Sequence, residues 1–228
     1  MGIADLLFPK TCLGCGREGS FVCASCMGKM ALLKQVCPEC NRPSVDGFTH
    51  VKCKRPWGLD GLVLLWPYGG VVRKAILKLK YNYATAIAED LAAEIVSVLR
   101  SKKTVLPKNI LLTPVPVHWM RGNMRGFNQS EEVGRLIVGK MDWKVIPDLV
   151  VRKSNTVPQT SLKRKDRLSN VRGAFVLNPK YSLSKLLTTN YQLLIFDDVW
   201  TTGSTIREVA KVLKRKGIKS VWGMAIAR

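Results

Sequence analysis

Short apolar runs alternate with amphipathic stretches along the chain after about residue 60. The runs at 62–66, 110–113, 193–196 and 221–227 predict buried strands. Helical spacing of apolar residues predicts helices over 71–79, 84–100 and 128–140, and a last helix whose buried face holds Ile206, Val209, Ala210 and Leu213. Because strands alternate with helices, we expect an α/β domain with a mostly parallel, doubly wound sheet.

Two helix ends carry local signals. Asn128, with Glu131 three residues later, resembles a capping box and predicts the start of a helix. Gly217 follows the last helix and is expected to end it. The intervening chain is less regular, and we expect an extended segment over 143–152, a strand over 173–177 and an insertion-like connection over 178–190.

All seven cysteines lie before residue 54. Six of them form Cys-x2-Cys pairs, and one stands alone: Cys12 with Cys15, Cys23 with Cys26, Cys37 with Cys40, and Cys53. In a chain that we expect to be cytosolic, such pairs indicate thiolate coordination of zinc rather than disulfides. The first two pairs predict one four-cysteine site. Redox use of the pairs is the alternative.

His50 gives the lone Cys53 a partner, because His50-x2-Cys53 keeps the spacing of the pairs with histidine in place of the first cysteine. Cys37, Cys40, His50 and Cys53 then predict a second site. Four protein ligands leave no open position for water, so we expect two structural zinc ions. An interleaved arrangement, in which the first pair joins the third, also fits the spacing.

The most informative stretch begins with the apolar run at 193–196. Asp197 and Asp198 follow it directly, and a loop then opens the last helix with Thr201, Thr202, Gly203, Ser204 and Thr205. An open α/β sheet binds ligands at this edge, and a helix start with free N–H groups suits a phosphate. Two carboxylates would repel a phosphate, so we expect them to face sugar hydroxyls or a metal ion. An ordinary strand–turn–helix is the alternative, but it does not require this residue set.

This pattern resembles the signature of type I phosphoribosyltransferases. The resemblance implies that Asp197 and Asp198 hold the ribose of phosphoribosyl pyrophosphate and the shell of its Mg²⁺, and that the loop 201–205 holds the 5′-phosphate. It also implies that the loop after the strand at 110–113 receives the pyrophosphate. Arg121 and Arg125 are the candidate charges there, because arginine presents a planar fork to phosphate oxygens. A surface or nucleic-acid contact is the alternative role for both.

The composition adds a strong positive charge of +21, from 37 Lys and Arg against 16 Asp and Glu. Such a charge attracts polyanions, although a solubilising surface is the alternative explanation. The segment 152–172 holds seven basic residues and one acid, and it stands where such transferases have a loop that closes over the donor. Its basic side chains could bind either pyrophosphate or DNA, and the sequence does not decide between them. The candidates for this contact are Lys153, Lys163, Arg164 and Arg167.

The boundaries of the chain's parts follow from the same patterns. Proline and glycine within 54–60 predict a linker, so we expect a double zinc ribbon over 1–57 and a phosphoribosyltransferase-like domain over 58–228. No run of 18 apolar residues is present, and the first ten residues lack the features of a signal peptide. We therefore expect a cytoplasmic protein without a membrane span.

Taken together, these motifs resemble the ComF family of competence proteins, which joins a double zinc ribbon to a phosphoribosyltransferase-type domain. The motifs that carry the resemblance are the ribbons, the acid-pair signature, Val115-Pro116 and Arg125-Gly126-Phe127-Asn128-Gln129. The resemblance implies a role in DNA uptake during natural transformation, with a helicase and recombination factors as partners. The strong positive charge adds single-stranded DNA as an expected partner. It does not define the acceptor. A ligand sensor that binds single-stranded DNA is the alternative to a transferase.

Overall fold

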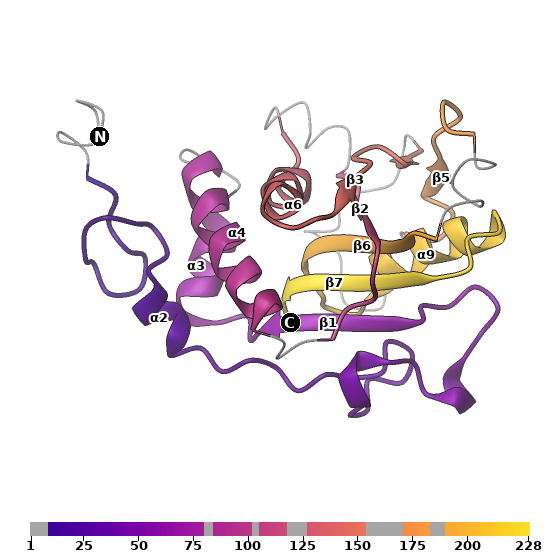
Figure 1. Cartoon of the computed structure of the whole chain (residues 1–228), viewed down its shortest axis with the longest axis horizontal. Helices are drawn as coiled ribbons and strands as arrows, with labels where there is room; N and C mark the ends of the chain where they lie inside the picture. The colour runs from indigo at the N-terminus through magenta and orange to yellow at the C-terminus, as the bar shows by residue number, and fades with distance from the viewer. Residues whose placement is uncertain (1–8, 80–83, 102–104, 118–126, 154–170, 183–189) are drawn as a thin grey trace.

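The computed structural model describes residues 9–79, 84–101, 105–117, 127–153, 171–182 and 190–228. The centre of the fold is a five-stranded sheet in the order β1 (Gly61–Trp66), β7 (Val221–Ala227), β6 (Gln192–Val199), β2 (Ile110–Pro114) and β3 (Lys144–Val145) (Figure 1). Every pairing between these neighbours is parallel. The predicted α/β class with a mostly parallel sheet is confirmed.

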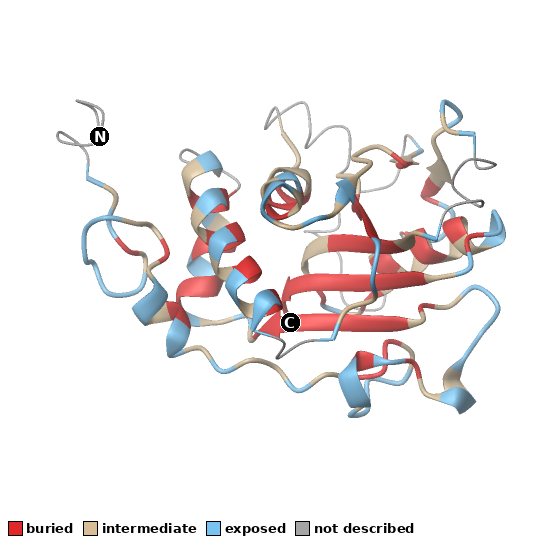
Figure 2. Ribbon diagram, viewed as in Figure 1, coloured by how far each residue is buried: buried red, intermediate tan, exposed pale blue. Residues whose placement is uncertain are grey.

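Helices cover both faces of the sheet. On one face lie α3 (Gly70–Lys78), α4 (Ala84–Arg100) and α6 (Gln129–Lys140), and on the other lies α9 (Ser204–Arg215). Side chains of β6 alternate between the two cores, with Leu194 and Phe196 in one and Leu193 and Ile195 in the other. The central strands are therefore buried on both faces, which explains why they are continuous apolar runs (Figure 2).

The sheet reverses its winding direction between β2 and β6. From β2 the chain passes through α6 to β3 on one side, whereas from β6 it passes through α9 to β7 on the other. The two strands are neighbours, with Pro114 of β2 opposite Phe196 of β6. Such a switch point opens a crevice outside the carboxyl ends of the strands, and ligands of open α/β sheets bind there.

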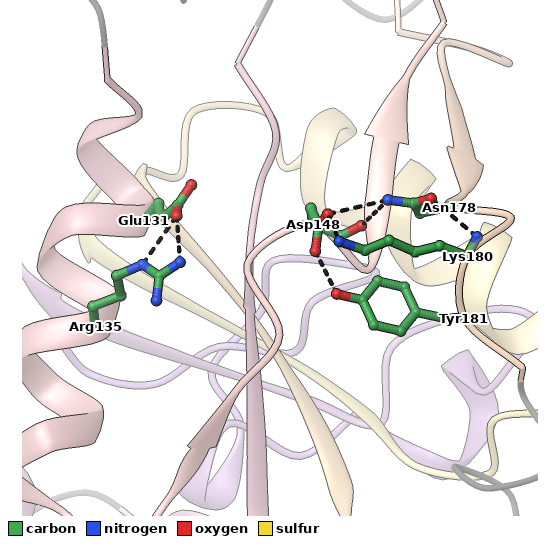
Figure 3. A network of polar contacts seen from close by, with 6 residues as sticks. All are labelled: Glu131, Arg135, Asp148, Asn178, Lys180 and Tyr181. Atoms are coloured by element: carbon green, nitrogen blue, oxygen red, sulfur yellow. Dashed lines mark hydrogen bonds and ion pairs between the residues drawn. The ribbon is translucent and has the colours of Figure 1, made fainter.

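The predicted helix ends form with one difference. Asn128 caps α6 by accepting a hydrogen bond from the Ser130 N–H at 3.1 Å. Glu131 does not return to the Asn128 backbone; its carboxylate pairs with Arg135 at 2.9 Å (Figure 3). The capping box is thus only half formed, because a nearby guanidinium offers the carboxylate a charged partner. Gly217 ends α9 with a φ of 93°, as predicted.

The segments predicted over 143–152 and 173–177 do not both join the main sheet. The first splits into β3 and β4 (Val150–Arg152), and β4 pairs antiparallel with β5 (Phe175–Leu177) in a separate two-stranded sheet. Pro147 lies in the turn between β3 and β4 and has no N–H to continue a ladder. Because Arg152 at the end of β4 lies opposite Phe175 at the start of β5, the two ends of the basic segment that connects these strands are adjacent.

A polar network fixes the base of this two-stranded sheet. The carboxylate of Asp148 accepts hydrogen bonds from Tyr181 Oη at 2.5 Å and from Asn178 Nδ2 at 3.2 Å, and it pairs with Lys180 (Figure 3). The pKa of Asp148 lies below its usual value: burial would raise it, but the bonds from Lys180 and Tyr181 outweigh that effect. The network ties the turn before β4 to the chain after β5.

The free edge of β1 is covered by the chain between the two cysteine clusters. Leu33 N–H donates to Leu65 O at 2.9 Å, and the Gln35 amide exchanges two hydrogen bonds with the Leu64 backbone, each of 2.9 Å. A covered edge cannot pair with another chain. None of the helices in the described part of the chain has the length and apolar character that a membrane span requires.

Candidate functional site

The acid pair lies at the end of β6, on the carboxyl side of the switch point. Asp197 Oδ1 accepts a hydrogen bond from Ser130 Oγ, in the first turn of α6, at 3.3 Å. It also accepts one from the Asp198 N–H at 2.9 Å. Because α6 follows β2, the contact with Ser130 brings the connection after β2 to the carboxyl end of β6. The sequence did not indicate Ser130 as a site residue.

The two carboxylates interact unfavourably when no ligand is bound. Removal from water and the neighbouring charge of Asp198 raise the pKa of Asp197 well above its usual value, and the bonds from Asp198 N–H and Ser130 only partly offset this. A raised pKa means that the carboxylate form is disfavoured in the ligand-free site. Any partner that supplies positive charge or hydroxyl donors therefore stabilises it. Sugar hydroxyls and a hydrated cation are such partners.

The loop after the acid pair has a fixed backbone. Gly203 caps α9 with a φ of 75°, and a Cβ built on it would lie 2.2 Å from the ring of Trp200. Thr202 Oγ1 donates to Ser204 Oγ at 3.0 Å and accepts from Ser204 N–H at 3.3 Å. The first turn of α9 holds no acid, and Gly203 has no side chain to occupy the free N–H groups. This is a typical anion-binding helix start.

Buried polar atoms without a hydrogen-bond partner occur near this edge. Among the described residues they are Thr113 Oγ1 on β2, Gln129 Oε1 at the start of α6 and Trp200 Nε1 in the loop after β6. Buried polar groups in native proteins are usually paired with protein, water or a ligand. Their location next to the ends of β2 and β6 is what a ligand or water site would produce.

The predicted pyrophosphate residues fall outside the described part of the chain. Arg121 and Arg125 belong to the undescribed 118–126, and Lys163, Arg164 and Arg167 belong to the undescribed 154–170. Lys153 is described; it is exposed, and its N–H donates to Ala174 O at 2.7 Å. Of the predicted donor-site residues, the structure therefore brings together the acid pair and the loop 201–205.

The first cysteine cluster has the dimensions of a zinc site. The ligand atoms of Cys12, Cys15, Cys23 and Cys26 all lie within 4.8 Å of one another, and Cys23 Sγ lies 3.5 Å from Cys12 Sγ and 3.8 Å from Cys15 Sγ. Four sulfurs at about 2.3 Å from a tetrahedral zinc would be about 3.8 Å apart. Bonded sulfurs would be about 2.05 Å apart, so the thiols are free rather than disulfide-linked.

The second cluster combines three cysteines with His50. The ligand atoms of Cys37, Cys40, His50 and Cys53 also lie within 4.8 Å of one another, and His50 Nδ1 is 3.5 Å from Cys40 Sγ. On its other side, His50 Nε2 lies 3.0 Å from Pro43 O. An Nε2–H that donates to this carbonyl leaves the Nδ1 lone pair directed at the cluster, as second-shell bonds of metal-bound histidines do. The structure thus shows the sequential grouping.

The thiols of both clusters favour a cation. The pKa of Cys26 is raised to about 12, first by its hydrogen bond with Cys15 and then by burial. That of Cys53 is raised to about 11, first by burial and then by its hydrogen bond with Cys40. Burial would also raise the pKa of Cys12, but backbone hydrogen bonds outweigh that effect and lower it to about 6. Some thiols thus ionise readily, and because neighbouring thiolates repel one another, Cys26 and Cys53 retain their protons until a metal ion replaces them. The residues present fit zinc.

The two clusters dock on different parts of the fold. Near the first, Asp90 on α4 accepts hydrogen bonds from the N–H groups of Phe21 at 2.6 Å and Val22 at 3.1 Å. Near the second, Arg207 on α9 donates to Pro38 O, inside the pair formed by Cys37 and Cys40, at 2.7 Å. Figure 1 shows the first cluster's segment beside α3 and α4 and the second beneath β1.

This geometry defines the class of the protein as a mostly parallel α/β protein with an N-terminal double zinc ribbon. Residues 3–55 match the family described as "Double zinc ribbon domain". That match covers both cysteine clusters.

The chain is also similar to curated relatives over most of its length. It is 29% identical to "Competence protein F" of Haemophilus influenzae over 95% of this chain and 90% of that protein. It is 28% identical to "DNA utilization protein YhgH" of Escherichia coli K12 over 91% and 90%, and 24% identical to "Competence protein ComFC" of Bacillus subtilis over 86% and 79%. The resemblance to the ComF family is confirmed.

Proposed function

We propose that the chain binds phosphoribosyl pyrophosphate with Mg²⁺ at the switch point and acts in DNA uptake during natural transformation. The observation that carries the donor site is the acid pair Asp197 and Asp198 at the end of β6, followed within one loop by the left-handed Gly203 at the start of α9. The role in uptake is supported by relatives named as competence and DNA utilization proteins. We propose the cytoplasmic side as its location.

In this proposal, different residues bind different parts of phosphoribosyl pyrophosphate. Asp197 and Asp198 accept hydrogen bonds from the ribose hydroxyls and stand in the metal's shell, while the N–H groups and hydroxyls of 201–205 bind the 5′-phosphate. Arg121 and Arg125 are proposed for the pyrophosphate. Mg²⁺, when bound, neutralises charge on the pyrophosphate oxygens.

Transfer to an acceptor is the reaction that such a site supports. The bond from ribose C1 to pyrophosphate breaks, pyrophosphate leaves with the electron pair, and a nucleophile of the acceptor forms the new bond at C1. Stabilisation of the departing anion is then the main catalytic contribution. None of the described side chains at this edge is an evident base for the acceptor, so the acceptor must be found by experiment.

Calorimetry with phosphoribosyl pyrophosphate and Mg²⁺ tests the donor site. We expect the wild type to bind and Asp198→Ala to lose binding, with Asp142→Ala, an exposed acid elsewhere on the chain, as the matched control. A wild type that does not bind would refute the donor site. Pyrophosphate release with nucleobases or DNA then separates a transferase from a ligand sensor, because a sensor binds the donor without turnover.

Two structural zinc ions complete the proposal, one held by Cys12, Cys15, Cys23 and Cys26 and one by Cys37, Cys40, His50 and Cys53. Each set provides four protein ligands, which closes the coordination sphere and leaves no position for a substrate. The short ribbon segments contain few buried side chains of their own, so metal binding supplies free energy for their folding.

A second surface favours single-stranded DNA. Trp57 is 47% exposed, with the guanidinium carbon of Arg215 4.4 Å from its ring centroid, and Phe48 is 48% exposed. Lys52, Lys54 and Arg55 on the same ribbon are exposed. Exposed aromatic rings among basic side chains are what single-stranded nucleic acids require, because bases stack on the rings while the cations contact phosphates.

Fluorescence anisotropy with a labelled oligothymidine tests this surface. We expect Trp57→Ala to weaken binding by roughly 1–3 kcal/mol, the range for one stacked base, and affinity to fall steeply with salt. Tyr68→Ala is the control, because Tyr68 is also an exposed ring, with the guanidinium carbon of Arg73 6.0 Å from its centroid. It lies at the opposite end of β1 from the ribbon surface. Equal effects of both variants would contradict a specific surface on the ribbon.

A further inference from the structure

Arg207 contacts two segments that are far apart in the sequence: the second zinc ribbon and the loop that precedes α9. Its Nε lies 2.7 Å from Pro38 O in the second ribbon, and its Nη1 lies 2.8 Å from Thr202 O in the loop that precedes α9. Nη2 also donates to Pro38 O. The guanidinium carbon lies 5.1 Å from the ring centroid of Trp200. The planar guanidinium is therefore fixed by two backbone carbonyls and one aromatic ring.

The environment of Arg207 shows that these contacts are enclosed. Burial lowers the pKa of its guanidinium, which nevertheless stays charged because arginine's ordinary pKa is very high. Pro38 is buried, Thr202 is half-buried, and Trp200 is almost fully buried beneath the guanidinium. Hydrogen bonds from a charged donor in such surroundings are stronger than those on an open surface.

The two acceptors of Arg207 have defined places in the two sites. Pro38 lies between Cys37 and Cys40, so its carbonyl belongs to the turn that presents two ligands of the second cluster. Thr202 directly precedes Gly203. Because the peptide unit is planar and trans, a Thr202 carbonyl fixed toward Arg207 makes the Gly203 N–H point the opposite way, away from Arg207.

We infer that Arg207 is a positioning residue that couples the second zinc site to the phosphate loop, so that occupation of either site strengthens binding at the other. The inference rests on the proposed donor site and adds its regulation. Metal in the ribbon holds the turn at Pro38, that turn orients the guanidinium, and the guanidinium orients the Thr202–Gly203 peptide. By thermodynamic linkage the effect is equal in both directions.

The first cluster provides an internal control. It docks on α4 through Asp90 and on α3 through Lys74, whose Nζ lies 2.9 Å from Leu13 O. Those contacts are made with helices on the opposite face of the sheet from α9. The coupling should therefore involve the second zinc and leave the first unaffected.

The test measures donor affinity and zinc release on the full-length protein. Phosphoribosyl pyrophosphate with Mg²⁺ is titrated by calorimetry into the wild type, Arg207→Gln, Arg207→Lys and the control Lys211→Gln, which changes a cation on the same helix. We expect both Arg207 variants to bind about 5- to 50-fold more weakly than the control. Arg207→Lys separates positioning from charge, because lysine keeps the charge but lacks the rigid planar fork that donates to two carbonyls in fixed directions.

The reciprocal measurement follows zinc transfer to a chromogenic chelator. The release phase that is missing in His50→Ala is assigned to the second site. The donor should slow that phase in the wild type, slow it no longer in Arg207→Gln, and leave the other phase unchanged. A general loss of stability would accelerate release without removing its dependence on the donor, so this readout separates positioning from a merely structural role.

The outcomes separate the two proposals. If the wild type binds the donor and both Arg207 variants bind equally well, the coupling is wrong and the proposed function stands. Wild-type affinity in Arg207→Lys alone would assign the effect to charge and also overturn the coupling. If the wild type does not bind the donor, the proposed function fails and the coupling fails with it.

Discussion

Ser130 Oγ lies 3.3 Å from Asp197 Oδ1, and this contact joins the first turn of α6 to the end of β6. It links the connection that follows β2 to the carboxyl end of β6 at the switch point. The hydroxyl is the only side-chain donor to Asp197 among the contacts of the described residues. A single hydroxyl compensates poorly for two adjacent carboxylates, so the site is under electrostatic strain until a ligand binds.

Asp197→Asn should stabilise the ligand-free protein while abolishing donor binding. The amide oxygen can still accept from Ser130, but the repulsion from Asp198 is gone. Because Asp197 is only partly buried, we expect a gain of about 1 kcal/mol at pH 7, the low end of the range for relieving an unfavourable buried polar group. Thermal unfolding in a chelator measures it, with Asp142→Asn as the exposed control.

The pH dependence of that gain has a definite sign. A carboxyl whose folded pKa is raised stays protonated in the fold while it ionises in the unfolded chain above about pH 3.9, so stability is lost as pH rises from there to the folded pKa. The advantage of Asp197→Asn should therefore be small near pH 4 and largest at neutral pH. An advantage that grows toward acid would contradict the assignment.

Gly203→Ala should cost more than an ordinary substitution of a left-handed glycine. The new Cβ would meet the Trp200 ring at 2.2 Å, in addition to the strain of a φ of 75°. Gly173 has a φ of 70° and no heavy atom within 4 Å of a built Cβ, so Gly173→Ala isolates the backbone strain of about 1–2 kcal/mol. Chemical denaturation should show a clearly larger loss for Gly203→Ala, and equal losses would disprove the packing argument.

The sequence predicted the elements whose pattern is local. Strands buried on both faces are apolar runs, and the acid pair with its loop is contiguous, so both could be found without knowing any tertiary contact. Spacing predicted the cysteine pairs and their sequential grouping but also allowed an interleaved one, and the structure shows the sequential grouping. In each case the relevant residues are neighbours in the chain.

What escaped prediction depends on contacts between distant segments. Ser130 and Asp197 are 67 residues apart, and Arg207 and Pro38 are 169 apart. Arg207 looked like one more cation on a basic helix. For Ser130 a weak signal existed, because it shares a helix face with the buried Val133 and Ile137. The pairing of β4 with β5 was also missed, since short, half-buried strands do not specify their partner.

His50→Ala should remove one zinc ion and leave the other. Native mass spectrometry should show two zinc ions in the wild type, one in His50→Ala and two in His50→Cys, which restores a thiolate at the same position. Loss of a direct ligand should cost more affinity than the roughly 10- to 100-fold effect of outer-shell substitutions. His118→Ala, which changes the only other histidine, is the control. Two tightly bound zinc ions in His50→Ala would exclude His50 as a ligand.

Tyr181→Phe should destabilise the protein at neutral pH and lose that effect in acid. Tyr181 Oη donates to Asp148 at 2.5 Å, and the pKa of this carboxyl is lowered because bonds from Lys180 and Tyr181 outweigh its burial. A lowered folded pKa contributes stability that is present above about pH 3.9 and disappears as pH falls through the folded value. Because the side chains are partly exposed, we expect only about 0.5–1 kcal/mol at pH 7. Urea unfolding at pH 7 and pH 3 measures the difference, with Tyr68→Phe as the control, and a penalty that persists unchanged in acid would show that the hydroxyl acts independently of the Asp148 charge.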